Sequence, residues 1–217
     1  MPLDCQRIVS DAFAVLNEVG LDGLTLRRLA ARLDVKAPAI YWHFKSKQAL
    51  LDEMATEVLR RAMCANAALE SLLGWQEWAA AYYSGLRNSL LQFRDGAKMF
   101  SGTYRTDTDL YAPMEASLRR MAAAGFTLRQ AVVGLKALYS YTIGFVIEEQ
   151  ALQFAPGEPN PQYNLAERER RVNRKLHPLA SAAGEDLFMQ QGSSFAEGIG
   201  LIIAGLAAQL GQNPGTV

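Results

Sequence analysis

The side chains best suited to specific polar contacts are cationic and are concentrated near the N-terminus. Residues 24–47 contain six lysines and arginines and one acidic residue. An arginine can form paired hydrogen bonds with guanine or with two phosphate oxygens, and lysines suit the phosphates that position a protein on DNA. This segment is therefore a candidate surface for binding double-stranded DNA. Its candidate contact residues are Thr25, Arg27, Arg28, Lys36, Ala37, Pro38, Ala39, Tyr41, Trp42, His43 and Lys47.

Hydrophobic spacing predicts two helices that would hold the arginines on an outer face. Apolar residues recur every three or four positions over 5–19, and Gly20 is suited to end that helix. Thr25 is a good N-cap for a second helix over 26–33. The leucines of the second helix would face a core, so its arginines would face outward.

A tight turn and a short helix are predicted to follow. Asp34 and Val35 would form the turn, and Pro38 suits the first turn of a helix over 38–43, where its missing N–H is no loss. Two helices separated by such a turn have the size to enter a major groove. Small side chains at the start of the second one would let it approach the base edges closely.

Composition alone leaves a second interpretation open, in which the arginines form the solvated face of a small helical bundle. The formal net charge of the whole chain is zero, which is unusual for a nucleic-acid reader. The charge is unevenly distributed, however, because residues 1–47 carry a net charge of +2 and residues 24–47 a net charge of +5. We therefore interpret the N-terminal segment as a DNA-reading head on a larger, near-neutral body.

The remaining chain is predicted to be helical, with no strand. Ser46 is placed to cap a long helix that extends to residue 65. The expected domains are a DNA-binding domain over 1–48, a linking helix over 49–66 and a body over 67–217. Within the body we expect a connector over 69–73, helices over 75–93, 107–124, 127–154, 165–175 and 194–210, and a proline-rich loop over 155–164.

Composition places the chain among soluble globular proteins. Half of the residues are hydrophobic, which is enough to form a buried core and argues against disorder. The two cysteines, Cys5 and Cys64, lack metal-like or redox spacing and are interpreted as free thiols. The N-terminus has no signal-like segment, and no apolar run reaches the roughly 20 residues of a membrane span. We expect a cytoplasmic protein with no membrane partner.

Several blocks of the sequence resemble the tetracycline repressor family of homodimeric regulators. The blocks are residues 16–25, 33–35, 40–47 (Ile-Tyr-Trp-His-Phe-Lys-Ser-Lys) and 49–52 in the head, and 93–98, 102–103, 142–150 and 195–210 in the body. The resemblance implies an all-α fold. It would have an N-terminal three-helix helix-turn-helix DNA-binding domain and a C-terminal helical domain for ligand binding and dimerisation.

By the same resemblance, the partners are a palindromic DNA operator, a small-molecule effector and a second copy of the chain. Dimerisation would use the helices over 127–154 and 194–210, and the latter alternates small with large apolar residues, as close helix packing requires. The resemblance and the aromatic content together indicate effector-binding residues. They are Met63, Tyr82, Leu86, Phe100, Thr103, Ser117, Val132, Leu135, Tyr139 and Glu148.

The head departs from the family's tetracycline-responsive members at two positions. Ala37 and Ala39 stand where those members carry a glutamine and a threonine that contact bases. Each lost hydrogen-bonded base pair contact is worth about 1–3 kcal/mol of discrimination. A different operator sequence is therefore expected, with Arg27 as the main base contact.

The body departs from the same members where they grip the drug and its magnesium ion. Two histidines, an asparagine and a glutamine are replaced by Phe100, Met63, Tyr82 and Ser117. This favours a flat, largely apolar, antibiotic-like aromatic effector and no cofactor or metal site. Magnesium would be needed only if the effector is a tetracycline chelate. Glu148 could then hold a metal-bound water. Otherwise it would act as a hydrogen-bond acceptor or as a buried partner of Lys136 or an arginine.

Three function classes are thus weighed. The first is a ligand-responsive repressor whose effector is either metal-free or a magnesium–tetracycline chelate. In it, the 46–65 helix and residues 94–103 would transmit ligand binding to the head. Gly96 and Gly102 would absorb the accompanying change in backbone conformation. The second is a helical interaction module that uses its basic face for a protein or membrane. The third, an enzyme, is disfavoured because the sequence lacks a nucleophile–histidine–aspartate set, a phosphate-binding glycine loop and metal-ligand spacing.

Overall fold

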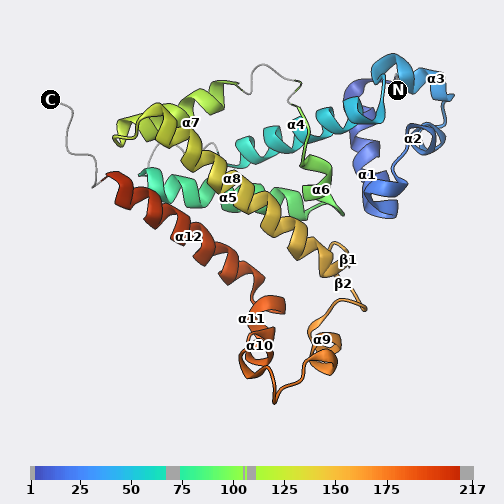
Figure 1. The fold of residues 1–217 in the computed structure, drawn as a ribbon. Helices are drawn as coiled ribbons and strands as arrows, with labels where there is room; N and C mark the ends of the chain where they lie inside the picture. Colours follow the sequence, from blue (N-terminus) through green and yellow to red (C-terminus); the bar gives the residue numbers. More distant parts are fainter. Residues whose placement is uncertain (1–2, 67–73, 105, 107–110, 211–217) are drawn as a thin grey trace.

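The computed structural model describes residues 3–66, 74–104, 106 and 111–210, and these are almost entirely α-helical (Figure 1). The all-α prediction is confirmed. The longer helices are α1 Cys5–Gly23, α2 Leu26–Arg32, α3 Ala37–His43, α4 Lys47–Asn66, α5 Trp75–Leu91, α7 Tyr111–Ala123, α8 Leu128–Ala151 and α12 Gln191–Leu210. The shorter elements are α6 Gly96–Phe100, β1 Gln153–Ala155, β2 Glu158–Pro159, α9 Leu165–Arg171, α10 Pro178–Ala182 and α11 Gly184–Phe188.

The head consists of α1, α2 and α3 packed against the start of α4. Its core is fully buried and draws on each of these helices: Ile8, Leu16, Leu29, Ile40 and Leu50. The predicted caps form as expected, because Thr25 accepts a hydrogen bond from the Arg28 N–H and Ser46 accepts one from the Ala49 N–H, at 3.1 Å in each case.

The turn before the third helix and the break near the end of the first are also as predicted. Asp34 has a positive φ of 53°, and Gly20 has a φ of 71° and lies outside helical geometry. Aspartate and glycine are among the residues that adopt this left-handed region most readily. The last residues of α1 therefore run in a new direction after Gly20.

The body is a stack of long helices that continues from α4. Helix α5 packs against both α4 and α8, and α12 packs on α8 and α5 (Figure 1). A Cβ on Gly134 of α8 would lie 2.8 Å from the Leu206 Cδ2 of α12, so glycine allows these two helices to approach closely. The small elements α9, α10 and α11 lie at the bottom of Figure 1, far from the head.

A buried ion pair holds the centre of the body. Arg87 of α5 makes two hydrogen bonds to Glu149 of α8, at 2.8 and 2.5 Å, and both side chains are largely buried. The guanidinium also lies 5.3 Å from the centre of the Phe195 ring on α12. The pair therefore joins three helices, and its charges compensate each other where water is scarce.

The structure corrects the prediction between α8 and α12. Residues 153–159 form a short antiparallel hairpin where neither a strand nor a turn was predicted, and Gly157 supplies a φ of 80° at its turn. Helix α8 ends at Ala151 instead of residue 154, and α9 ends at Arg171 instead of residue 175. Helices α10 and α11 were not predicted. The expected connector over 69–73 and the first residues of the 107–124 helix lie outside the described residues.

Two helices present exposed apolar side chains on the outside of the body. Leu128 and Val133 of α8 are 68% and 53% exposed, and Leu201 of α12 is 77% exposed. Both helices are also long and apolar enough to cross a membrane, a property that core and interface helices share. Such faces on long helices mark a surface that another protein chain can cover.

Candidate nucleic-acid interface and ligand cavity

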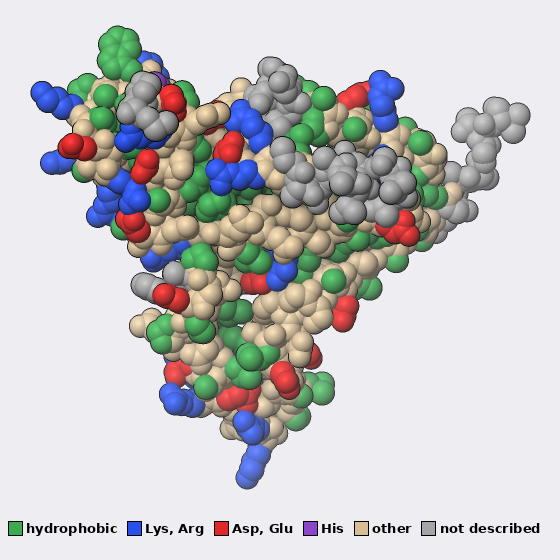
Figure 2. Space-filling model, turned by 180° about the vertical axis from the view of Figure 1, so that it is seen from behind, with side chains coloured by type: hydrophobic (Ala, Val, Ile, Leu, Met, Phe, Trp, Pro, Cys, Tyr) green, Lys and Arg blue, Asp and Glu red, His purple; other side chains and the backbone are tan. Residues whose placement is uncertain are grey.

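Helix α3 projects from the head with large exposed side chains. Trp42 is 81% and Tyr41 48% exposed, and the Lys45 Nζ lies 5.5 Å from the centre of the Trp42 ring. Lysine and arginine side chains gather over the head, at the upper left of Figure 2. Exposed aromatic and cationic groups on a short projecting helix suit contact with a DNA groove and its phosphates.

The arginines of α2 differ in what they contact. Arg27 is exposed, and its guanidinium has no hydrogen bond or ion pair among the described residues. Arg28 is also exposed, but its guanidinium donates to the Gly23 carbonyl at 3.1 Å. Arg32 pairs with Asp11 at 2.9 Å and with Glu18 at 2.5 Å, and hydrogen bonds to these carboxylates raise the pKa of Arg32. Arg27 is thus the arginine of α2 that is free to reach a base.

Three other predicted contact residues also have structural partners. Thr25 caps α2. The half-buried Lys47 donates through Nζ to the Leu21 carbonyl at 2.7 Å. The His43 Nδ1 lies 3.5 Å from the Cys5 Sγ. The remaining predicted residues lie at the start of α3, where Lys36 and Pro38 are exposed and Ala37 and Ala39 are partly buried.

A cavity of about 630 Å³ lies in the body beneath α4. Its walls come from α4, α5, α6, α7 and α8 and from the segment after α6. Nine of the ten predicted effector residues line it: Met63, Tyr82, Leu86, Phe100, Thr103, Ser117, Val132, Leu135 and Tyr139. These residues are up to 76 positions apart in the sequence, and the fold brings them to one place. The volume is suitable for a drug-sized molecule.

Several hydroxyl groups of the cavity already serve the fold. The Tyr83 hydroxyl donates to the Leu135 carbonyl at 2.9 Å, and burial raises the pKa of Tyr83. The Ser117 and Thr103 hydroxyls donate to the carbonyls of Pro113 and Phe100. Each of these hydroxyl oxygens can still accept a hydrogen bond from a ligand.

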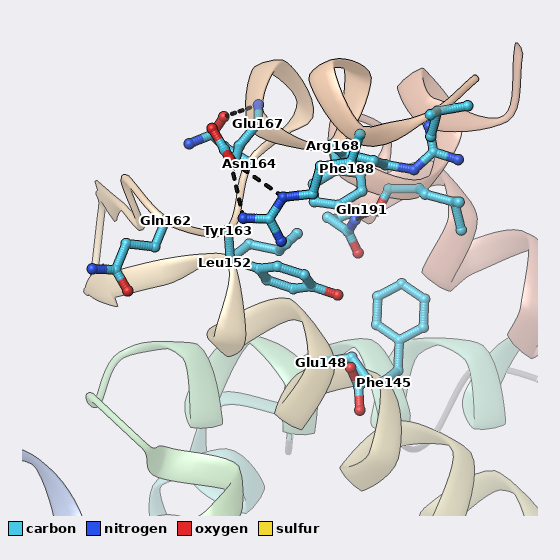
Figure 3. Close-up of a pocket in the computed structure, with 13 residues that line it drawn as sticks. Phe145, Glu148, Leu152, Gln162, Tyr163, Asn164, Glu167, Arg168, Phe188 and Gln191 are labelled. Atoms are coloured by element: carbon cyan, nitrogen blue, oxygen red, sulfur yellow. Dashed lines mark hydrogen bonds and ion pairs between the residues drawn. The ribbon is translucent and has the colours of Figure 1, made fainter. Parts of the chain in front are cut away.

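Glu148 does not join the other nine residues. It is exposed and lines a second cavity of about 580 Å³, between the end of α8 and helices α9, α11 and α12. Figure 3 shows Phe145 and Glu148 on one side of this cavity and Arg168 and Phe188 on the other. On its rim, a hydrogen bond from Arg171 lowers the pKa of Glu167. Glu148 and Lys136 therefore do not share a cavity within one protomer, so their predicted pairing is not seen.

The cavity does not fit the magnesium chemistry of tetracycline binding. Its described lining contains no histidine and no carboxylate, and Phe100, Met63, Tyr82 and Ser117 all face it. No group of three or more His, Cys, Asp or Glu that could hold a metal ion occurs among the described residues. Hard divalent cations need oxygen ligands, above all carboxylates, that this lining does not provide.

A turn between α5 and α6 connects the cavity wall to the head. The Leu21 N–H donates to the Asp95 carboxylate at 2.9 Å, and the Arg94 N–H donates to the Asn17 side chain at the same distance. The rings of Phe13 and Phe93 stack with their centres 4.2 Å apart. The turn thus contacts α1 directly, a few residues before Phe100 and Thr103 line the cavity.

The segment after α6 contacts the helix that links head and body. The Tyr104 N–H donates to Asp52 at 3.0 Å, and the Thr106 N–H donates to the Thr56 hydroxyl at 3.1 Å. Behind α6, the Gln150 amide accepts from the Ala97 N–H at 3.0 Å and donates to the Phe93 carbonyl at 2.7 Å. A shift of α6 would therefore change contacts with both α1 and α4.

Sequence reasoning missed most of these connecting residues. The family-like blocks included Asn17, Asp52 and Gln150, but no connecting role was assigned to them, and Thr56 was not singled out. Their partners are about 50 to 77 positions away. A polar residue on a helix gives no local signal of such a distant contact.

The head is a helix-turn-helix unit in which Arg27 has no partner among the described residues. Helix α4 joins this head to a ligand-sized cavity. Together these features define a ligand-responsive DNA-binding regulator. Residues 8–54 match the family model of bacterial regulatory proteins, tetR family, and residues 72–210 match that of the tetracyclin repressor-like C-terminal domain. The chain belongs to the TetR family. It is accordingly a transcriptional repressor that responds to a ligand.

Individual relatives agree with this assignment over nearly the whole chain. The tetracycline repressor protein class D of Escherichia coli is 36% identical over 96% of this chain and 91% of its own. A possible TetR family transcriptional regulator from Streptomyces coelicolor A3(2) is 34% identical, with a TM-score of 0.82, over 94% of this chain and 99% of its own. A TetR-Q116A from Acinetobacter baumannii AYE in complex with minocycline is 28% identical, with a TM-score of 0.71, over 96% and 98%.

Proposed function

We propose that this protein is a cytoplasmic, non-enzymatic homodimer that represses transcription from a palindromic operator. A flat, largely apolar aromatic molecule would bind the cavity beneath α4 and release the operator. The observation that carries the proposal is the convergence of nine separately predicted residues on one aromatic-lined cavity. The walls of this cavity contact the DNA-reading head through the 94–95 turn.

On DNA, α3 would enter the major groove with α2 across the backbone. Arg27 would contact a base, and the exposed Arg28, Lys36, Tyr41 and His43 would contact phosphates or the groove edge. Trp42 would add apolar contact at the tip of α3. Thr25 and Lys47, which already have partners within the head, would serve mainly to hold the helices in place.

Dimerisation would use α8 and α12, whose outer faces are apolar and uncovered in a single chain. Burial of apolar area contributes about 25 cal/mol per Å². A twofold dimer presents its two heads to half-sites about one helical turn apart, so a palindrome is expected.

Ligand binding would act by changing the relation between the two heads. Helix α6 lines the cavity at Phe100 and contacts α1 and α4 through its flanking segments. An effector that binds more tightly when α6 is displaced would favour an arrangement of the two heads that does not match the operator. A coupling of about 3 kcal/mol gives a loss of operator affinity of more than a hundredfold.

A second candidate effector is a magnesium–tetracycline chelate, because the chain is 36% identical to a tetracycline repressor protein. The cavity lining argues against it, since the lining provides no imidazole or carboxylate for the metal. Calorimetry with tetracycline, with and without EDTA, separates the two candidates. Tight binding that EDTA abolishes would replace the metal-free proposal.

The proposed function is tested by selecting DNA from a random pool with the purified protein. We expect an inverted repeat, bound as a dimer with a steep salt dependence and with a sequence preference that persists at physiological salt. Binding that shows no sequence preference would instead support a helical module with a general basic face. Competition with a panel of aromatic compounds then identifies effectors by release of the selected operator.

A further inference from the structure

One charged side chain lines the effector cavity among the residues that the structure describes. This is Lys136, on the face of α8 that also carries Val132 and Tyr139. The other described lining residues are apolar, aromatic or hydroxyl-bearing. The Lys136 ammonium makes no hydrogen bond or ion pair with any described residue.

Three acidic side chains on the surrounding helices have cationic partners, and Glu148 of α8 lines the other cavity. On α4, Glu53 pairs with Arg60 at 3.0 Å. On α7, Glu115 pairs with Arg119 at 2.7 Å. On α8, Glu149 pairs with Arg87. Lys136 thus supplies a positive charge that these carboxylates do not neutralise.

Three hydroxyls of the cavity are already committed as donors. The hydroxyls of Tyr83, Ser117 and Thr103 donate to backbone carbonyls, so their oxygens can accept from a ligand. The tyrosine side chains of the lining carry neutral donors, whereas Lys136 carries the one charged donor among the described lining residues. A charge-assisted hydrogen bond is about twice as strong as a neutral one.

We propose that the effector is an aromatic anion, whose carboxylate or phenolate oxygen binds Lys136 while its rings lie among Tyr82, Phe100 and Tyr139. This inference rests on the proposed function and specifies its ligand class. A cationic aromatic compound would meet an unfavourable charge, and a neutral one would gain no charge-assisted contact with the exposed Lys136.

The test uses two probes of the same shape, anthraquinone-2-carboxylate and anthraquinone-2-carboxamide, titrated calorimetrically into the full-length dimer at neutral pH. We expect the carboxylate to bind about tenfold more tightly than the carboxamide, which corresponds to about 1.4 kcal/mol. In Lys136→Met this preference should disappear through weaker carboxylate binding, with carboxamide binding unchanged. Lys136→Arg should keep the preference, and Lys175→Met, at the far end of the body, should behave as the unaltered protein.

Equal affinities for the two probes in the unaltered protein would overturn the inference, as would no binding of either. The inference would also be overturned if Lys136→Met bound neither probe while its stability to unfolding was unchanged. Lys136 would then shape the cavity without selecting the charge of the ligand. Operator release separates this inference from the proposed function. If both probes bind equally and both release the operator, only the charge selection fails; if a bound probe never releases it, the proposed function fails.

Discussion

At the scale of single residues, the arginines of α2 show how one face of a helix can divide between structure and recognition. Arg32 is held by two carboxylates of α1, whereas Arg27 has no partner among the described residues. An exposed, uncommitted guanidinium keeps its five donors for an external acceptor. The two side chains are only five positions apart, so they form a matched pair for mutation.

Arg27→Ala should weaken binding by about 1–3 kcal/mol at one position of each operator half-site and leave the other positions unchanged. The measurement is a binding assay with the operator and with each single-base variant. Arg32→Ala is the control: it should lower the stability of the head and weaken all sequences alike. If Arg27→Ala weakened binding to all operator variants equally, Arg27 would be a phosphate contact and not a base contact.

The buried pair in the body permits a second prediction about side chains. Arg87→Met leaves the Glu149 carboxylate buried without its partner, so the free energy of unfolding should fall by about 3–5 kcal/mol. Denaturant unfolding measures the change. The double variant Arg87→Met with Glu149→Leu should recover much of the loss, because the unpaired charge is then gone. If the double variant is as unstable as the single one, packing around Phe195 matters more than charge.

At the scale of elements, α6 is the part of the body best placed to carry ligand binding to the head. It is only five residues long, and its two flanking segments contact α1 and α4. The glycine that begins α6 and the glycine just after its end differ in role. A Cβ on Gly96 would lie 2.2 Å from the Leu90 carbonyl oxygen, so Gly96 is required for close packing. Gly102 has a φ of 72° and open space around it, which suits a segment that changes its backbone conformation.

Asp95→Ala removes the carboxylate that accepts from the Leu21 N–H and should reduce coupling between cavity and head. Coupling is reciprocal, so the affinity for anthraquinone-2-carboxylate should differ between free and operator-bound protein, and this ratio should move towards one in the variant. Fluorescence titration with and without operator measures both affinities. Asp186→Ala on α11 is the control. An unchanged ratio in Asp95→Ala would move the transmitting contact elsewhere.

Elements with local signals could be predicted from the sequence, and elements that depend on distant partners could not. The Thr25 and Ser46 caps and the break at Gly20 follow from neighbouring residues, and they form as predicted. The hairpin over 153–159 is too short to show an alternating pattern. Asp95 accepts a hydrogen bond from Leu21, which is 74 positions away along the chain, and no local sequence pattern indicates this contact.

At the scale of the whole molecule, the uncovered faces of α8 and α12 are the surface on which we propose that a second copy docks. Leu201 is 77% exposed, and neighbouring Gly200 and Gly205 have no atoms within 4 Å of where a Cβ would lie. Large exposed leucines beside bare glycines allow a second helix to approach closely. A dimer formed on this face would keep the two heads at a fixed separation, as reading a palindrome requires.

Leu201→Glu should dissociate the dimer, because it places a charge in the apolar interface, and should lower operator affinity in parallel. Sedimentation velocity measures the mass. Leu179→Glu makes the same change on α10, where the side chain is 85% exposed, and should leave the dimer intact. A Leu201→Glu protein that sediments as a dimer would place the interface on another face.

Helix α4 has a further consequence for how such proteins can be recombined. Leu50 and Met54 belong to the buried core, and the next residues, Ala55 and Thr56, are equally buried and also line the effector cavity. No spacer separates the two roles, and the change falls within one turn of a continuous helix. A chimera that grafts this DNA reader onto another sensor therefore needs its junction inside α4, between Met54 and Ala55, in helical phase. If the junction were placed at the end of α4, the α4 residues that line the cavity of the first sensor would be transferred into the second sensor.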